Sequence, residues 1–176
     1  NVTINNSGMT LTLAGMILAG DFNSIVTNAG ISMGSTSGQN FSVTANGIQI
    51  EQLIAGGTTT LAAGTGDLIA TGLNDFGGNV TVSSSANTSL FMPNNTNIFL
   101  GAVQATGTFL LSTFGSMVFP WDGLPTGNFD LTSTQLSNFN VGTFSAVASS
   151  DITLPQGFSF SGIGNLSLTA GASIQS

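Results

Sequence analysis

Short runs of alternating apolar and small polar residues recur along the whole chain. Examples are Val2–Ile4, Leu11–Leu13, Val80–Val82 and Leu166–Leu168, each with a Thr or Ser between two apolar residues. This period of two is typical of a strand that buries one of its faces. Segments containing Gly, Asn or Pro separate the runs and predict turns. We therefore expect an all-β chain in which Val, Ile, Leu and Phe face inward and Thr, Ser and Asn face outward.

One sequence phrase, an apolar-Thr strand closed by Ala and a Gly turn, occurs several times. Variants of it are found at Leu11–Gly15, Ser42–Gly47, Thr59–Gly64 and Leu166–Gly171. Such recurrence indicates a stack of similar units, and the very short strands favour a parallel β-helix, or β-solenoid, with coils of about 20 residues. The alternative is an antiparallel β-sandwich, which would need longer strands and two-residue hairpin turns.

A second period is formed by phenylalanines spaced ten residues apart. We expect them to form a core aromatic series in which ten residues mark half a coil; its members are Phe99, Phe109, Phe119, Phe129 and Phe139. Residues 1–176 are expected to be a single β-repeat domain or an internal slice of a longer repeat array. Residues 83–151, which contain three of the four prolines, depart furthest from the repeat and are expected to be its least regular part.

The composition excludes several classes of function. The chain has no Lys, Arg, His or Cys, and its seven carboxylates give a net charge of −7. Without cations the chain cannot neutralise phosphate, so we expect no nucleic-acid binding. Without Cys or His there are no disulfides and no good ligands for zinc or copper. The sequence also lacks an uninterrupted stretch of 18 apolar residues, so no membrane insertion is expected.

The same inventory leaves little room for catalysis. Nucleophile systems that depend on a His or Lys base are absent, and only a two-carboxylate glycosidase would survive. The sole Trp, Trp121, precedes Asp122 and could lie against a sugar, although an aromatic next to Pro120 is more commonly a packing residue. We therefore predict a protein that is not an enzyme, with no catalytic residues, no cofactor and no metal ligands.

Three segments resemble the haemagglutinin-type repeat of filamentous haemagglutinin-like exoproteins: Thr58–Ile69, Asn74–Val82 and Asn165–Ile174. The resemblance is clear over residues 41–82 and 152–176. It implies a right-handed parallel β-helix. It also implies secretion to the extracellular space or the bacterial cell surface, with a role in adhesion and cell–cell contact.

The two ends of the chain carry candidate assembly edges. These are Val2, Thr3 and Ile4 near the N-terminus and Leu166, Ser167 and Leu168 near the C-terminus, and no charged residue or Pro interrupts either set. Unpaired strand edges are templates for the addition of another strand. We therefore expect the chain to pair with itself end to end, or with flanking repeats. The predicted function is an extracellular structural protein: a self-associating fibre subunit or the stalk of a microbial surface adhesin.

Two other classes of function stay open from the sequence. A β-solenoid can serve as a ligand-binding module, with surface glycans as candidate partners or with an ice-binding face of Thr residues, for which Thr10–Thr12, Thr58–Thr60 and Thr132–Thr134 are candidates. The sandwich alternative would instead suit a donor-strand, pilin-like subunit with Asn1–Leu18 as the exchanged strand.

Overall fold

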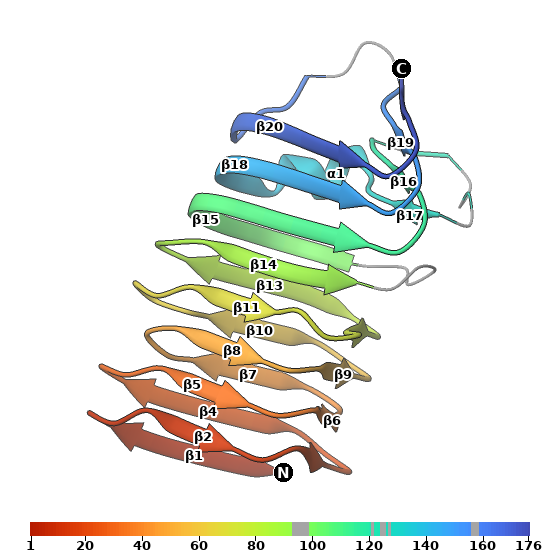
Figure 1. Cartoon of the computed structure of the whole chain (residues 1–176). Coiled ribbons are helices and arrows are strands. Elements are labelled where there is room, and N and C mark those ends of the chain that lie inside the picture. Colours follow the sequence, from red (N-terminus) through yellow and green to blue (C-terminus); the bar gives the residue numbers. More distant parts are fainter. Residues whose placement is uncertain (93–98, 121, 124–125, 127, 156–158) are drawn as a thin grey trace.

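The computed structural model of the chain is a right-handed parallel β-solenoid of about eight coils (Figure 1). It describes residues 1–92, 99–120, 122–123, 126, 128–155 and 159–176. The coils stack directly on one another, so the two termini lie at opposite ends of the stack (Figure 1). All strand pairs in this part of the chain are parallel, which confirms the solenoid and rules out the antiparallel sandwich.

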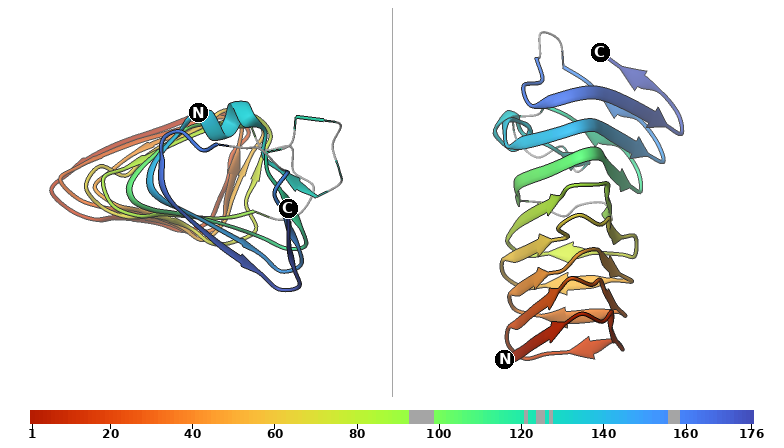
Figure 2. Two further views of the ribbon diagram at one scale, coloured as in Figure 1. Left: turned by 90° about the horizontal axis from the view of Figure 1, so that it is seen from above. Right: turned by 90° about the vertical axis from the view of Figure 1, so that its left-hand side faces the viewer.

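Each coil has three faces, which give the stack a triangular outline when it is viewed along its axis (Figure 2). The first face contains β1 (Val2–Ser7), β4 (Phe22–Thr27), β7 (Phe41–Thr44), β10 (Thr59–Ala62) and β13 (Asn79–Ser84). The second face contains β2 (Leu11–Leu13), β5 (Ile31–Met33), β8 (Ile48–Ile50), β11 (Leu68–Ala70) and β14 (Thr88–Met92).

The later coils join these two faces through long strands that turn the first corner without a break. These strands are β15 (Phe99–Thr113), β18 (Phe139–Ala148) and β20 (Ile163–Ala170). The third face is built from shorter strands in two groups: β3 (Met16–Ile17), β6 (Thr36–Gly38), β9 (Leu53–Ala55) and β12 (Asp75–Phe76), then β17 (Phe129–Asp130), β16 (Met117–Val118), β19 (Ile152–Thr153) and β21 (Ile174–Gln175).

Alternate residues of each strand fill the lumen of the solenoid. In β7, buried Phe41 and Val43 alternate with exposed Ser42 and Thr44, as the sequence pattern predicts. The prediction is wrong for β4, where Ser24 is buried in the lumen and Ile25 lies on the outer surface, 44% exposed. Equivalent side chains stack from coil to coil: Phe22 pairs with Phe41, and Ile31 pairs with Ile48. Each fully buried Val, Leu, Ile or Phe stabilises the fold by about 1.5–3 kcal/mol. The lumen is therefore one continuous and mainly apolar column, with a few buried polar side chains such as Ser24, Thr59 and Thr88.

The regular coil length is interrupted once, between the sixth and seventh coils. In the first five coils, partners on the first face are 18 to 21 residues apart, but Val103 pairs with Phe139, which lies 36 positions later. The inserted segment contains β17, which pairs with β16 on the side opposite β19, and α1 (Ser133–Ser137). Thr132 caps α1 in a capping box with Gln135, and the helix packs against β15. Residues 83–92 and 99–118 by contrast follow the coil repeat.

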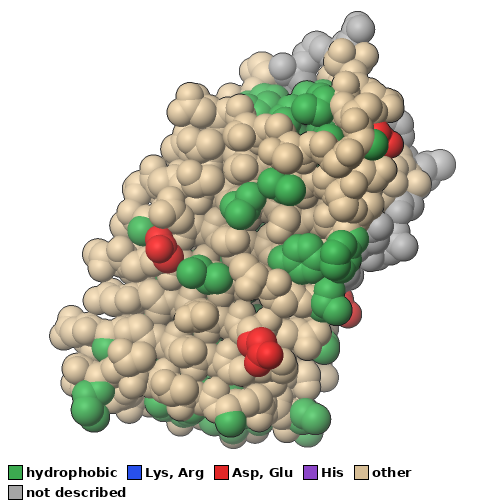
Figure 3. All heavy atoms as spheres, in the orientation of Figure 1, with side chains coloured by type: hydrophobic (Ala, Val, Ile, Leu, Met, Phe, Trp, Pro, Cys, Tyr) green, Lys and Arg blue, Asp and Glu red, His purple; other side chains and the backbone are tan. Residues whose placement is uncertain are grey.

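The outer surface of the stack is mostly polar. Figure 3 shows the second face of the stack, where the visible carboxylates lie apart from one another and the apolar side chains form a few separate groups. Among the residues described, no helix combines the length and the apolar character needed to cross a membrane.

Candidate assembly site

The first and last coils present strands that are paired on one side only. At the N-terminal end, β1 pairs with β4, β2 with β5 and β3 with β6, each on one side. At the C-terminal end, β20 pairs with β18 and β21 with β19. Because the described strands are all parallel, the two open edges face opposite ways along the axis. The C-terminal edge of one copy can therefore form parallel strand pairs with the N-terminal edge of another.

The predicted N-terminal edge residues lie on β1. Val2 and Ile4 point into the lumen and are half-buried, whereas Thr3 is exposed on the outer surface. The other lumen residues of this coil are also only partly buried: Leu11, Leu13, Met16 and Leu18. Their counterparts one coil further on, such as Phe22 and Ile31, are 1% and 2% exposed. A further coil stacked on this end would therefore bury the lumen side chains of the first coil.

The predicted C-terminal edge residues lie on β20. Leu166 and Leu168 stack on the buried Phe144 and Ala146, so they belong to the lumen side, whereas Ser167 stacks on outward-facing Ser145. Leu166 is 36% exposed, and Ile174 of the same coil is 52% exposed. Both ends thus leave lumen positions open to solvent that interior coils bury.

Asn and Asp side chains form a ladder along one corner, between the third face and the first. The side-chain Oδ1 of Asn1 accepts a hydrogen bond from the backbone N–H of Asp21 at 3.0 Å. Asp21 Oδ1 in turn accepts the backbone N–H of Asn40 at 3.2 Å and its side-chain amide at 2.8 Å. Asn40 Oδ1 accepts the backbone N–H of Thr58 at 2.8 Å. Each rung ties one coil to the next.

The same device recurs at two other places in the stack. At the first corner, Asp67 Oδ1 accepts the backbone N–H of Asn87 at 3.0 Å, and Asn87 Oδ1 accepts that of Thr108 at 2.9 Å. Near the C-terminal end, Asp151 Oδ1 accepts the backbone N–H of Ser173 at 3.0 Å. In every case the acceptor lies in one coil and the donor in the coil that follows. The ladders therefore have one direction along the axis.

Asn74 fastens three coils together from inside the structure. Its fully buried side chain accepts a hydrogen bond from the Leu53 N–H at 2.8 Å, in the coil before it. Its amide donates to the carbonyls of Ala70 and Phe91, both at 2.8 Å, and the Phe91 carbonyl belongs to the coil after it. The bonds to Leu53 and Phe91 thus join Asn74 to the coils on both sides, and the bond to Ala70 fixes the side chain within its own coil.

The two carboxylates of the inserted segment hold its own backbone. Asp122 accepts the Ser133 N–H at 2.8 Å and also the Ser133 hydroxyl, and Asp130 accepts the Thr126 N–H at 2.7 Å. The hydroxyl and then the N–H of Ser133 lower the pKa of Asp122 below its ordinary value of 3.8, against a small opposing effect of burial. Five of the seven carboxylates therefore accept backbone hydrogen bonds.

The described members of the aromatic series converge in the lumen around the insertion. Phe109, Phe119, Phe129 and Phe139 are all buried. The rings of Phe109 and Phe139 have centroids 5.3 Å apart, and both rings contact Phe144. The interpretation of ten residues as half a coil is wrong for Phe119 and Phe129. Phe119 directly follows β16, and Phe129 lies in β17, which pairs with β16, so both residues lie on the third face and not on opposite sides of a coil. Phe99 begins β15, and its side chain lies outside the described part of the chain, as does Trp121.

The Asx ladders and the buried Asn74 were not identified from the sequence. A signal was present: Asn1, Asp21 and Asn40 are 20 and 19 residues apart, and Asp67 and Asn87 are 20 apart, which is one coil in each case. Within the described ranges, no group of three or more Asp or Glu side chains is arranged to hold a metal ion.

Comparisons of this chain with protein-family models, with curated proteins and with solved structures found no match. The resemblance to the haemagglutinin-type repeat therefore stays a prediction, and the fold and the geometry of the coil edges carry the functional argument.

Proposed function

We propose that this chain is a structural protein of the extracellular space: a self-associating fibre subunit or a segment of the stalk of a surface adhesin, at the microbial cell surface or in its matrix. One observation carries the proposal. The coils stack through strand edges and a shared lumen, and both are left open in the first and last coils. The coil that covers each end comes either from the same polypeptide or from a second copy of it.

The internal chemistry of the stack supports this mechanical role. The Asx ladders, the buried Asn74 and the apolar column all connect one coil to the next, which is the direction in which a rod is loaded. Eight coils at a strand spacing of about 4.8 Å make a stack about 40 Å long. Added coils lengthen it without any change in geometry.

The distribution of charge supports axial rather than lateral growth. All seven charged side chains are negative, and the nearest to the two edges are Asp21 and Asp151, neither of which lies on β1 or β20. Two stacks lying side by side repel each other, whereas the edge strands carry no charged side chain. Covering the exposed lumen gains about 25 cal/mol for each Å² of apolar surface removed from water.

The test is the length of particles formed by the purified protein as its concentration rises, measured by negative-stain electron microscopy. We expect rods that are multiples of one stack. Ile4→Lys puts a charge into the open lumen and should shorten the rods to single stacks. The matched control is Ser42→Lys, which adds the same charge to the outer side of β7 in an interior coil and should leave rod length unchanged. Single stacks from the parent protein at every concentration, or full-length rods from Ile4→Lys, would show that the ends do not associate.

A further inference from the structure

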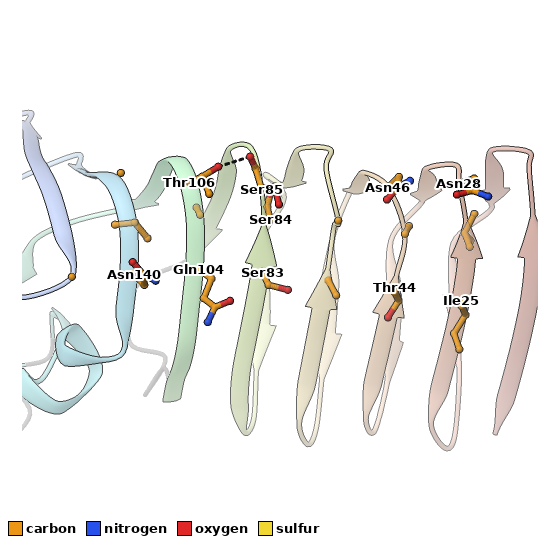
Figure 4. Close-up of a pocket in the computed structure, with 18 of the residues that line it drawn as sticks. Ile25, Asn28, Thr44, Asn46, Ser83, Ser84, Ser85, Gln104, Thr106 and Asn140 are labelled. Carbon is orange, nitrogen blue, oxygen red and sulfur yellow. Dashed lines mark hydrogen bonds between the residues drawn. The ribbon is translucent and has the colours of Figure 1, made fainter.

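A long groove follows the outer surface of the stack beside its first corner. It has a volume of about 1000 Å³ and extends from β4 in the second coil to the start of β20 in the eighth. Two rows of side chains line it side by side (Figure 4). The sheet row consists of Ile25, Thr44, Ala62, Ser83, Gln104 and Asn140, and the corner row consists of Asn28, Asn46, Gly64, Ser85 and Thr106.

The sheet row is a true ladder. Ile25 pairs with Thr44, Ser83 pairs with Gln104, and Gln104 pairs with Asn140, each in the neighbouring strand. Neighbouring strands lie about 4.8 Å apart, so the row offers side chains at a regular interval along the axis. Such a lattice suits a ligand that is itself a polymer of similar units lying parallel to the axis.

The groove is uncharged, and its lining combines polar side chains with apolar ones such as Ile25, Ala62 and Ile163. Its lining contains amides and hydroxyls, with neither a carboxylate nor an aromatic ring among the residues that form it. The side-chain amides of Asn28, Gln104 and Asn140 make no hydrogen bond to the rest of the described chain, whereas Thr106 donates to the Ser85 carbonyl within the corner row (Figure 4). Free donors and acceptors therefore point outward along most of the groove's length.

These features separate the possible ligands. An acidic polymer finds no cation here to neutralise it and meets a chain of net charge −7. An extended peptide binds best by adding to a free strand edge, but the groove runs across the strands, whose backbone groups are already paired. A chain of uncharged, hydroxyl-bearing units can use the amides and hydroxyls that line the groove in the second to seventh coils, except in the fourth, where Ala62 and Gly64 line it.

We propose that this groove binds a neutral polysaccharide chain that lies along the solenoid axis. The proposal is independent of whether the coils associate end to end. Without an aromatic platform, each sugar unit gains only hydrogen bonds that replace those to water, so each contributes little. Affinity should therefore rise with the length of the sugar chain, as successive units occupy successive coils.

The test is affinity electrophoresis of the purified protein in native gels that contain mannan, mixed-linkage β-glucan, dextran or, as an acidic probe, polygalacturonate. We expect one of the neutral polymers to retard the protein, and long oligosaccharides of that polymer to compete better than short ones. The double variant Gln104→Ala/Asn140→Ala should weaken retardation by about tenfold, the effect of losing two hydrogen bonds. The matched control is Ser32→Ala/Gln49→Ala, an outward pair in register on the second face, which should bind like the parent.

Three results would overturn the proposal. They are no retardation by any neutral polymer of the set, equal retardation of the groove variant and the control, and retardation by polygalacturonate alone. Binding of a Ser- and Gly-rich extended peptide, measured by fluorescence anisotropy in the absence of any polysaccharide binding, would assign the groove to peptides instead. Circular dichroism of both double variants shows whether the solenoid is intact.

Discussion

At the scale of single residues, the solenoid relies on Asn and Asp for connections that the backbone ladder does not make. Asp21, Asp67 and Asp151 each bind the backbone of the coil that follows, so they act as links along the axis. Spacing them apart also avoids the repulsion that stacked carboxylates would produce. These three carboxylates, among the seven in the chain, thus serve to hold one coil to the next.

The buried amide of Asn74 gives the sharpest stability prediction. Asn74→Ala leaves the Leu53 N–H and the Phe91 carbonyl without their partner, and unsatisfied buried groups cost about 1–3 kcal/mol each. We expect the free energy of unfolding to fall by about 3 kcal/mol, measured by chemical denaturation. The control Asn23→Ala removes an exposed amide from β4 and should change stability by less than about 0.5 kcal/mol. A similar small loss for both variants would show that the Asn74 bonds contribute little.

Asp122 gives a prediction about pH. Because its pKa is lowered in the folded protein, its ionised form stabilises the insertion above the ordinary value of 3.8, and this stabilisation is lost as the pH falls through the lowered folded-state value. Nuclear magnetic resonance titration should find the Asp122 pKa below 3.8. Ser133→Ala removes the largest cause and should raise that pKa toward 3.8. A parent value at or above 3.8, or no change in the variant, would contradict the assignment.

At the scale of elements, local periodicity determines which residues face the lumen, but long-range pairing determines where each strand lies. The alternation predicted the inward residues of β7 and β20, because a period of two depends only on neighbouring residues. It did not predict β4, where Ser24 faces inward and Ile25 faces outward. It could not place the recurring phrases: Leu11–Leu13 lies on the second face, whereas Ser42 and Thr60 pair on the first. The local pattern could not predict the insertion before Phe139 either, since its strand β17 adds in parallel to β16 on the side away from β19.

The aromatic cluster around the insertion yields a prediction for these elements. Phe109 in β15 is fully buried and contacts Phe139 and Phe144 in β18. Phe109→Ala should lower stability by about 3–5 kcal/mol, because it removes a ring and leaves a cavity between two coils. Phe114→Ala is the matched control: that ring is 53% exposed and lies against Phe91, so its loss should cost less than about 1 kcal/mol. Equal losses in thermal or chemical unfolding would mean that the cluster does not hold β15 to β18.

At the scale of the whole molecule, the edges, the ladders and the lumen all have the same direction, along the axis of the stack. The candidate edges could be predicted from the sequence because short apolar-polar strands near both termini lack charge and Pro. The groove could not, because its two rows come from residues that only the coil register brings together. The proposed assembly would use the open ends and the proposed ligand binding would use the side of the stack, and the two surfaces meet only at the start of β20.

The most direct test of end-to-end stacking is the diffraction pattern of aligned assemblies of the purified protein, recorded by electron microscopy or X-ray fibre diffraction. If coils of one copy stack on coils of the next, strands lie across the long axis of the assembly. A strong meridional reflection at about 4.8 Å is then expected along that axis. A reflection at that spacing perpendicular to the long axis, or assemblies with no such reflection, would show that the copies associate through their sides and would contradict the account.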